Sequence, residues 1–282
     1  MNDTQSSGNR VALVISDVDG TLLDENKRLT PGAPGAVRRL YAAGIRFTIA
    51  SARPPLMVHG LVLKLEVREP FACFNGALYV RPDLTVMHEL PMSPTDAQTV
   101  ADQIIQDGFD LWVWTDTEWY VSNPSGPHVD HHEEQMGRRA TPLTTRDMSQ
   151  FKVLKLVGVS DNHEALAQAE ADLKQHGSPS ISATRSSPYY LDVTDVRANK
   201  GEVVLNLSKM LDIPTERIAT IGDMTTDTLM FRQSGISIAM GNATDDVKAQ
   251  AKYATRSNEE DGFAYAMDHF VLGIAAQPTA AD

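Results

Sequence analysis

Short continuous apolar runs alternate along the chain with segments in which apolar residues recur at helical spacing. Near the N-terminus, the intervening segments 36–43 and 56–65 read as helices. Continuous apolar strands separated by helices are typical of a parallel sheet that helices cover on both faces. The apolar runs that predict buried strands in this region are residues 11–15, 45–50 and 71–74.

The pattern changes near residue 84. Residues 111–115 and 118–121 alternate apolar and polar positions, which predicts antiparallel strands with one solvated face, and 162–176 reads as a helix. After Lys200 the first pattern returns, with helices at 202–211 and 226–233 and strands at 218–221 and 236–239. We therefore predict a doubly wound α/β core, Rossmann-like, formed by residues 1–83 and 193–282. An inserted α+β unit would occupy residues 84–192.

Polar residues follow the predicted core strands at the points where the strands end. In open parallel sheets, ligands bind outside the carboxyl ends of the strands, so these side chains are expected to meet at one edge. Four carboxylates in one place repel one another unless a cation lies between them, and an all-oxygen set suits Mg2+. The polar residues in question are Asp17, Asp19, Ser51, Asn75, Asp223 and Asp227, with Lys200 at the start of a later helix.

A purely structural interpretation of Asp17–Gly20 is also available, because Asp and Gly are common in turns. The second acidic motif, Gly222-Asp223 followed by Asp227, argues against it, since it recurs at the end of another predicted strand. We therefore interpret both motifs as parts of one site.

These motifs resemble those of the haloacid-dehalogenase-like (HAD) superfamily, in its Cof-like class IIB phosphatase branch. The resemblance extends over about residues 10–273 and includes a cap domain similar in size and position to the insertion. Two positions depart from the pattern of the branch: Ala52 stands for Gly, and Thr226 stands for Asn. The segments that carry the resemblance are DVDGTLL, IASAR, FNGAL, Lys200-Gly201, GDMTTD, IAMGNA and SNEEDGF.

The resemblance implies a phosphoric monoester hydrolase in which Asp17 is the nucleophile that forms an aspartyl-phosphate. Asp19 would be the general acid and then the general base, with its protonation favoured by the neighbouring carboxylate. The Asp17 carboxylate, the Asp19 carbonyl and Asp223 would hold the Mg2+ cofactor, and Asp227 would support them. Ser51 and Lys200 would contact or balance the phosphoryl group. The remaining residues expected to bind phosphate or line the pocket are Gly20, Thr21, Arg53, Asn75, Gly76, Thr226 and Asn242.

The amino-acid composition limits the classes of molecule that the protein is expected to bind. The net charge of −12 argues against nucleic acid or an anionic membrane surface, and no apolar run approaches the ~20 residues of a membrane helix. Cys73 is the single cysteine, which fits a reducing cytoplasm, and the polar first ten residues lack the apolar stretch of a signal peptide. We expect a cytoplasmic enzyme acting on a small phosphorylated metabolite, most simply a sugar phosphate.

Several alternatives stay open at this point. The same aspartyl-phosphate would serve a phosphotransferase or phosphosugar mutase, and the departures at Ala52 and Thr226 would suit a catalytically weakened binding module. The histidines at 128, 131 and 132 fit an exposed helix of the insertion better than a metal site. Trp112 and Trp114 share one strand face, which favours core packing over a substrate platform. Two interpretations of Arg53 are equally consistent with the sequence: it contacts phosphate, or it stabilises the loop that follows the second strand.

Overall fold

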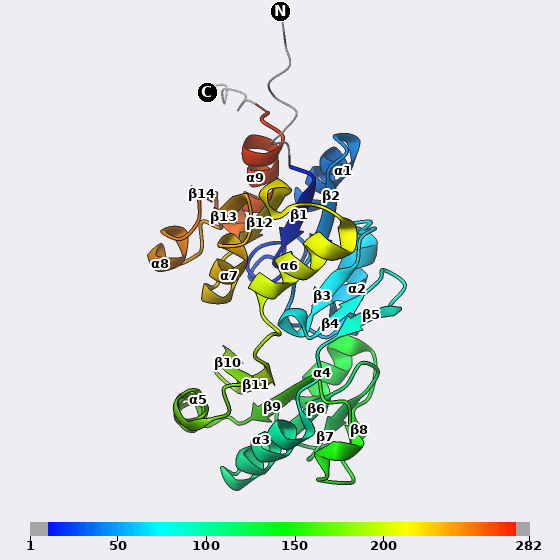
Figure 1. Cartoon of the computed structure of the whole chain (residues 1–282), viewed down its shortest axis with the longest axis vertical. Coiled ribbons are helices and arrows are strands. Elements are labelled where there is room, and N and C mark those ends of the chain that lie inside the picture. The colour runs from blue at the N-terminus through cyan, green and yellow to red at the C-terminus, as the bar shows by residue number, and fades with distance from the viewer. Residues whose placement is uncertain (1–10, 275–282) are drawn as a thin grey trace, which may run out of the picture.

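The computed structural model describes residues 11–274 and shows two layered halves (Figure 1). A five-stranded parallel sheet lies in the upper half, and a six-stranded sheet lies in the lower half. The predicted α/β fold with an added α+β unit is confirmed. The polar N-terminal stretch considered above lies outside the described residues.

The five-stranded sheet has the order β14-β13-β12-β1-β2, and every pair in it is parallel. The chain builds outward from β1 in both directions, so β1 and β12 are central neighbours at the point where the strand order reverses. Such a switch point leaves a crevice at the carboxyl ends of the strands. The strands are β1 (Leu13–Ser16), β2 (Arg46–Ile49), β12 (Ile218–Gly222), β13 (Ile236–Ala239) and β14 (Tyr253–Ala254).

Strand β1 is buried on both faces, as its continuous apolar sequence predicts. Val14 packs with helices α1 (Ala33–Ala42) and α9 (Gly262–Ala266) in one cluster. Leu13 and Ile15 point the other way and pack with α6 (Lys200–Leu211) and α7 (Thr228–Phe231). Because successive side chains of a strand alternate between faces, a strand covered by helices on both sides needs apolar residues at every position.

The third predicted strand does not join the parallel sheet, and this part of the prediction is wrong. Strand β3 (Phe71–Cys73) forms an antiparallel sheet with β4 (Leu78–Val80) and β5 (Val86–Glu89) and adjoins the end of β2 through a parallel Ala50–Ala72 bridge. The chain reverses directly after β3, because Phe74 and Asn75 have φ values of 50° and 56° and Gly76 has 107°. Helix α2 (Pro55–Lys64) precedes this hairpin.

The six-stranded sheet has the order β10-β11-β9-β6-β7-β8. Its outer face packs against α3 (Pro94–Gln106), a helix that the sequence reading did not anticipate, and α5 (His163–His176). The strands are β6 (Asp110–Trp114), β7 (Trp119–Val121), β8 (Thr141–Pro142), β9 (Lys155–Val159), β10 (Ile181–Ser187) and β11 (Tyr190–Asp195).

The inner face of this sheet is aromatic. Trp112 and Trp114 of β6 and Trp119 of β7 belong to the same buried cluster as Phe74 of the core hairpin, and α4 (Val129–Met136) packs nearby. The unit that bears this sheet is called the cap below. Its boundaries at residues 84 and 192 stay predictions, since β5 pairs with β4 and β11 runs on to Asp195.

The helix predicted at 226–233 is much shorter than expected. A 3₁₀ turn at Thr225–Asp227 leads into α7, which ends at Phe231. The carboxylate of Asp227 accepts hydrogen bonds from the backbone N–H groups of Asp223 and Met224, so the acidic motif folds as a tight turn before the helix begins. A short helix, α8 (Asp245–Lys248), follows β13. No helix within residues 11–274 is long and apolar enough to cross a membrane.

Candidate active site

Asp17 directly follows β1, and its backbone N–H donates to the carbonyl of Ile221 in β12 at 2.9 Å. Its carboxylate is buried, and Lys200 Nζ lies 2.5 Å from Asp17 Oδ1. Lys200 is the first residue of α6 and is also buried, and the side chain of Asn199 caps this helix by accepting the backbone N–H of Glu202. The structure thus joins a carboxylate and an ammonium that are 183 residues apart in the sequence.

Asp227 is the second partner of Lys200, which donates a short hydrogen bond to Asp227 Oδ1. Asp227 Oδ2 accepts the two backbone N–H groups of its own turn at 2.9 Å each. A Cβ atom on Gly222 would overlap the Asp227 carboxyl group, so glycine is required there. Asp227 therefore holds the lysine and the turn, and the oxygens left for a ligand belong to Asp17 and Asp223.

The carboxylates form a cluster suited to a cation. Oxygens of Asp17, Asp223 and Asp227 lie within 4.8 Å of one another. Burial raises the pKa of Asp17 well above its usual range against the attraction of Lys200, and Asp227 and Asp223 raise it further. Burial, followed by the charge of Asp227, raises the pKa of Asp223 to about 6. A hard divalent cation would offset this repulsion with the oxygen ligands it prefers, so the residues present fit such a metal.

Gly20 and Asn242 position Asp223 from the other side. Gly20 has φ +77°, and a Cβ atom there would overlap the carboxylate of Asp223. Asn242 Nδ2 donates to the Gly20 carbonyl at 3.0 Å and to Asp223 Oδ2 at 3.2 Å. Thr21 Oγ1 donates to Asp223 Oδ1 at 3.5 Å. These three residues, predicted to bind phosphate, contact the acidic cluster in this structure.

Asp19 has partners that the sequence reading did not assign to it. Arg53 donates two hydrogen bonds of 2.6 Å to its two carboxylate oxygens, and Lys27 donates one of 2.9 Å. Burial alone would raise the pKa of Asp19, but the hydrogen bonds and charges of Arg53 and Lys27 outweigh it and lower the pKa. The expectation that a neighbouring carboxylate favours protonated Asp19 does not hold here, because two cations lie closer.

Ser51 and Asn75 lie at the ends of β2 and β3. Ser51 is buried, and its hydroxyl accepts the backbone N–H of Arg53 at 3.1 Å. The backbone N–H of Asn75 donates to the Ser51 carbonyl at 2.9 Å, which fixes the two loops together. Gly76 packs against α6, where a Cβ atom would lie 2.8 Å from Val203 Cγ2. Gly76 therefore allows close packing behind the pocket.

A cavity of about 360 Å³ lies between this sheet edge and the inner face of the cap. The predicted residues that line it are Asp17, Asp19, Ser51, Arg53, Asn75, Lys200 and Thr226. The cap contributes the opposite wall, which includes Trp112, His132, Lys155, Tyr190 and Asp192.

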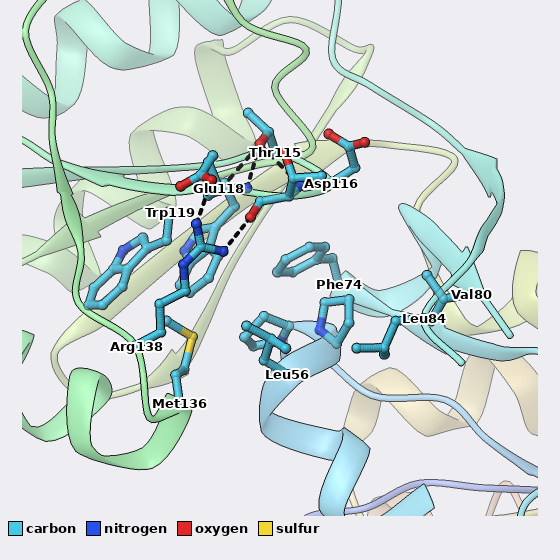
Figure 2. Close-up of a pocket in the computed structure, with 14 residues that line it drawn as sticks. Leu56, Phe74, Val80, Leu84, Thr115, Asp116, Glu118, Trp119, Met136 and Arg138 are labelled. Carbon is cyan, nitrogen blue, oxygen red and sulfur yellow. Dashed lines mark hydrogen bonds and ion pairs between the residues drawn. The ribbon is translucent and has the colours of Figure 1, made fainter. Parts of the chain in front are cut away.

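A second cavity, of about 330 Å³, opens between core and cap beside the first (Figure 2). Leu56 and Phe74 line it from the core, and Trp119 and Arg138 line it from the cap, where Arg138 pairs with Glu118. The two cavities share Pro54 and Trp114. Asp17 and Asp19 line the first cavity, and none of Asp17, Asp19, Asp223 and Asp227 lines the second.

Comparison with known proteins agrees with this geometry. The family model of haloacid dehalogenase-like hydrolases matches residues 14–267. The chain belongs to the haloacid dehalogenase-like hydrolase family. The prediction of a Cof-like HAD enzyme is confirmed by that match and by the fold.

Individual relatives of this HAD hydrolase span almost its full length. It is 27% identical to the 5-amino-6-(5-phospho-D-ribitylamino)uracil phosphatase YwtE of Bacillus subtilis, over 91% of this chain and 97% of the relative. It is 26% identical to the HMP-PP phosphatase of Cronobacter sakazakii, over 83% of this chain and 85% of that one.

Solved structures of the same fold superpose along most of the chain. A haloacid dehalogenase-like hydrolase from Bacteroides thetaiotaomicron matches with a TM-score of 0.80 and 24% identity, covering 93% of this chain and all of the other. A HAD subclass IIB sugar phosphatase matches with a TM-score of 0.80 and 23% identity, covering 92% and 99%. At this level of sequence identity, both matches show that the fold is shared.

The cap wall of the HAD hydrolase holds the residues that sequence reasoning missed. His132 was interpreted as part of an exposed helix; α4 is a helix, but His132 is half-buried and packs against Trp112 and Tyr190. Burial, followed by the charge of Lys155, lowers the pKa of His132 to about 3, so the ring is neutral. Trp112 is buried, as predicted, yet it also lines the cavity. The period-two alternation of β6, β9 and β11 was the available signal, because it places Trp112, Lys155 and Asp192 on one face.

Proposed function

We propose that this HAD hydrolase is a Mg2+-dependent phosphatase that hydrolyses small phosphorylated metabolites, in particular sugar phosphates, through an aspartyl-phosphate on Asp17. The observation that carries the proposal is the buried Asp17 carboxylate, held by Lys200 beside Asp223 at the floor of a cavity of about 360 Å³. The named relatives are phosphatases of small phosphorylated compounds, which supports the same class for this chain.

In the proposed reaction, an oxygen of Asp17 forms a bond to phosphorus as the bond from phosphorus to the alcohol oxygen breaks. Asp19 gives a proton to the departing alcohol and then takes one from the water that cleaves the aspartyl-phosphate, which releases inorganic phosphate and restores Asp17. Lys200 stays paired with Asp17 and Asp227 and offsets negative charge as phosphate enters. Asp17, Asp223 and the Asp19 carbonyl would hold Mg2+, which supplies further charge neutralisation at the phosphoryl oxygens when bound.

The ion pairs of Asp19 bear on this scheme. A carboxylate held by Arg53 and Lys27 is ionised, whereas proton donation needs the acid form. An incoming phosphate is a competing anionic partner for both cations, and Arg53 and Ser51 line the same cavity. We therefore propose that substrate draws Arg53 and Lys27 away from Asp19 and that the freed carboxyl group takes up its proton at that stage.

The cap, proposed to span residues 84–192, would select the alcohol part of the substrate. Its inner face forms the wall opposite Asp17, and it carries no residue of the acidic cluster. The core would then perform the same displacement on every accepted ester.

The test is phosphate release from p-nitrophenyl phosphate and from a panel of sugar phosphates, with Mg2+ and after chelation by EDTA. The expected result is turnover that EDTA abolishes and Mg2+ restores, with free phosphate as the product. Turnover that survives complete chelation would contradict the metal requirement. Stoichiometric transfer of the phosphoryl group to an added sugar, without free phosphate, would instead identify a phosphotransferase.

A further inference from the structure

A buried ion pair lies in the middle of the cap sheet and faces the active-site cavity. Lys155 Nζ lies 2.8 Å from Asp192 Oδ2, and the two side chains are 10% and 5% exposed. Lys155 is in β9 and Asp192 is in β11, where it pairs with Val157, so the two charged residues are diagonal neighbours across the antiparallel strands. Both residues line the cavity that contains Asp17.

The stability of the folded cap does not explain why charged residues occupy these two positions. Removing an ammonium and a carboxylate from water costs several kcal/mol per ion, and a well-packed apolar pair of similar volume is often as stable or more stable. The neighbours would accept such a pair: Lys155 lies opposite Trp114 in the sheet, and Val157, the next residue on the same face of β9, lies opposite Trp112. A role other than packing accounts better for the pair.

The Lys155–Asp192 pair retains hydrogen-bond donors and an acceptor that are not used within the described part of the protein. Asp192 Oδ1 has no hydrogen-bond partner among the described residues, although it is buried. The Lys155 ammonium has three donors, of which one serves Asp192. The cap thus holds an acceptor and donors side by side at the cavity wall.

The surroundings of the pair indicate which chemistry it accepts. Lys155 and Asp192 cancel each other's charge, and the other cap cation at the cavity, Arg185, pairs with Glu170. His132 is neutral, and Trp112 supplies an aromatic surface. A second anionic group would find no unpaired cation on this wall, whereas the C–H face of a sugar would pack on the rings and its hydroxyls would both donate and accept.

We propose that Lys155 and Asp192 together bind hydroxyl groups of an uncharged, polyhydroxylated leaving group and thereby determine the specificity of the enzyme. This inference rests on the proposed phosphatase function and names the part of the substrate that the cap reads. Lys155 is hydrogen-bonded through one donor and Asp192 through one oxygen, so two neighbouring hydroxyls would complete the set.

The test compares wild-type enzyme with the double variant Lys155→Met/Asp192→Leu, which removes both charges together and leaves no unpaired buried ion. Lys152→Met is the matched control, because Lys152 is an exposed cap lysine outside the cavity. The measured quantity is the ratio of kcat/KM for glucose 6-phosphate or ribose 5-phosphate to kcat/KM for p-nitrophenyl phosphate, which has no hydroxyl on its leaving group. The ratio should fall about 10- to 100-fold in the double variant, as expected for hydrogen bonds to charged groups, and stay unchanged in Lys152→Met.

A second double variant, with polar but uncharged side chains at positions 155 and 192, tests whether hydrogen bonding accounts for the change in the ratio. Lys155→Gln/Asp192→Asn keeps a donor and an acceptor at the two positions and should recover part of the lost ratio. An equal loss for both classes of ester in Lys155→Met/Asp192→Leu would make the pair structural and overturn the inference. An unchanged ratio would also overturn it.

Ligand binding separates this inference from the proposed function. All three tryptophans of the chain, Trp112, Trp114 and Trp119, belong to one aromatic cluster at the cap wall, so intrinsic fluorescence reports on this region. In the Asp17→Asn background, glucose 6-phosphate or ribose 5-phosphate should bind more tightly than inorganic phosphate, and the added double substitution should abolish the difference. Equal affinities before the double substitution would overturn the inference whether or not the enzyme is a phosphatase.

Discussion

The edge of the core sheet and the inner face of the cap place polar residues in opposite ways. In the core, the functional residues follow the ends of strands, where turns aim them through backbone hydrogen bonds, as with the N–H groups that bind Asp227. In the cap, Lys155 and Asp192 lie within strands and are aimed by side-chain alternation alone. Substituting a core residue therefore disturbs a backbone turn, whereas substituting a cap residue exchanges one side chain on a stable sheet.

This difference suits the two tasks that we propose for the core and the cap. Displacement at phosphorus needs the same charges in the same positions for any ester, and the turns provide that constancy. Recognition of the alcohol part needs a wall whose side chains differ from one enzyme to another while the sheet persists.

Lys200→Met should give the largest effect, because it leaves Asp17 and Asp227 buried together without their shared cation. Turnover should fall by more than about 1,000-fold, and unfolding should become easier by about 3–5 kcal/mol. Urea titration and phosphate release measure the two effects. Lys209→Met, at an exposed position of the same helix, is the control and should change neither.

Gly20→Ala should lower activity because the new methyl group would displace the Asp223 carboxylate. Gly108→Ala is a matched control, since Gly108 has a similar φ of +80° but open space where a Cβ would lie. Both variants carry a strain of about 1–2 kcal/mol from the left-handed backbone, seen in thermal unfolding. Only Gly20→Ala should also weaken apparent Mg2+ affinity, by about 10- to 100-fold. Equal Mg2+ affinities in the two variants would show that Gly20 does not position Asp223.

His132→Phe should make the cap more resistant to acid. The pKa of His132 is lowered to about 3 in the folded protein, whereas the unfolded chain binds a proton near pH 6.5, so acid favours unfolding below pH 6.5. Between pH 7 and pH 5 the wild type should lose about 1–2 kcal/mol more than His132→Phe. Chemical unfolding at the two pH values measures this difference, with His131→Phe, exposed on the same helix, as the control. Equal losses in the wild type and His132→Phe would show that His132 is not held neutral in the folded protein.

Thr226→Asn should have the smallest effect. Thr226 lines the cavity beside the acidic turn, and its short branched side chain reaches less far than Asn. Apparent Mg2+ affinity or turnover should rise, by up to about tenfold. Mg2+ titrations of phosphate release by the wild type and by Thr226→Asn measure this change. Weaker Mg2+ binding and slower turnover in Thr226→Asn would mean that threonine is the adapted residue.

The strand ends were predictable from the sequence because a buried parallel strand has a recognisable apolar run and its carboxyl end is a known place for ligands. Asp17, Asp223 and Lys200 were grouped on that basis, and the structure brings them together. The reversal after β3 was missed because it depends on positive φ at Phe74, a residue type that gives no sign of it. The partners of Asp19 were missed for another reason: Lys27 reaches it through a loop whose path no periodicity encodes.

The cap wall was the harder part. Strand alternation places Lys155 on the same face as its neighbours, but which strands lie side by side, and that β9 lies between β6 and β11, follows from tertiary packing. The pairing of Lys155 with Asp192 therefore becomes evident only in the three-dimensional structure. The same applies to His132, whose burial depends on the tryptophans of other strands.

If Asp17 attacks phosphorus, as we propose, the residue carries a phosphoryl group during turnover, and this adduct can be detected. The wild-type enzyme is mixed with a turned-over ester and Mg2+, quenched in acid within the first turnover, digested and examined by mass spectrometry. We expect a phosphate adduct on the peptide that contains Asp17, which disappears on longer incubation without substrate and is absent from Asp17→Asn. Rapid hydrolysis with no adduct on Asp17, or Asp17→Asn retaining more than about a hundredth of wild-type turnover, would contradict it.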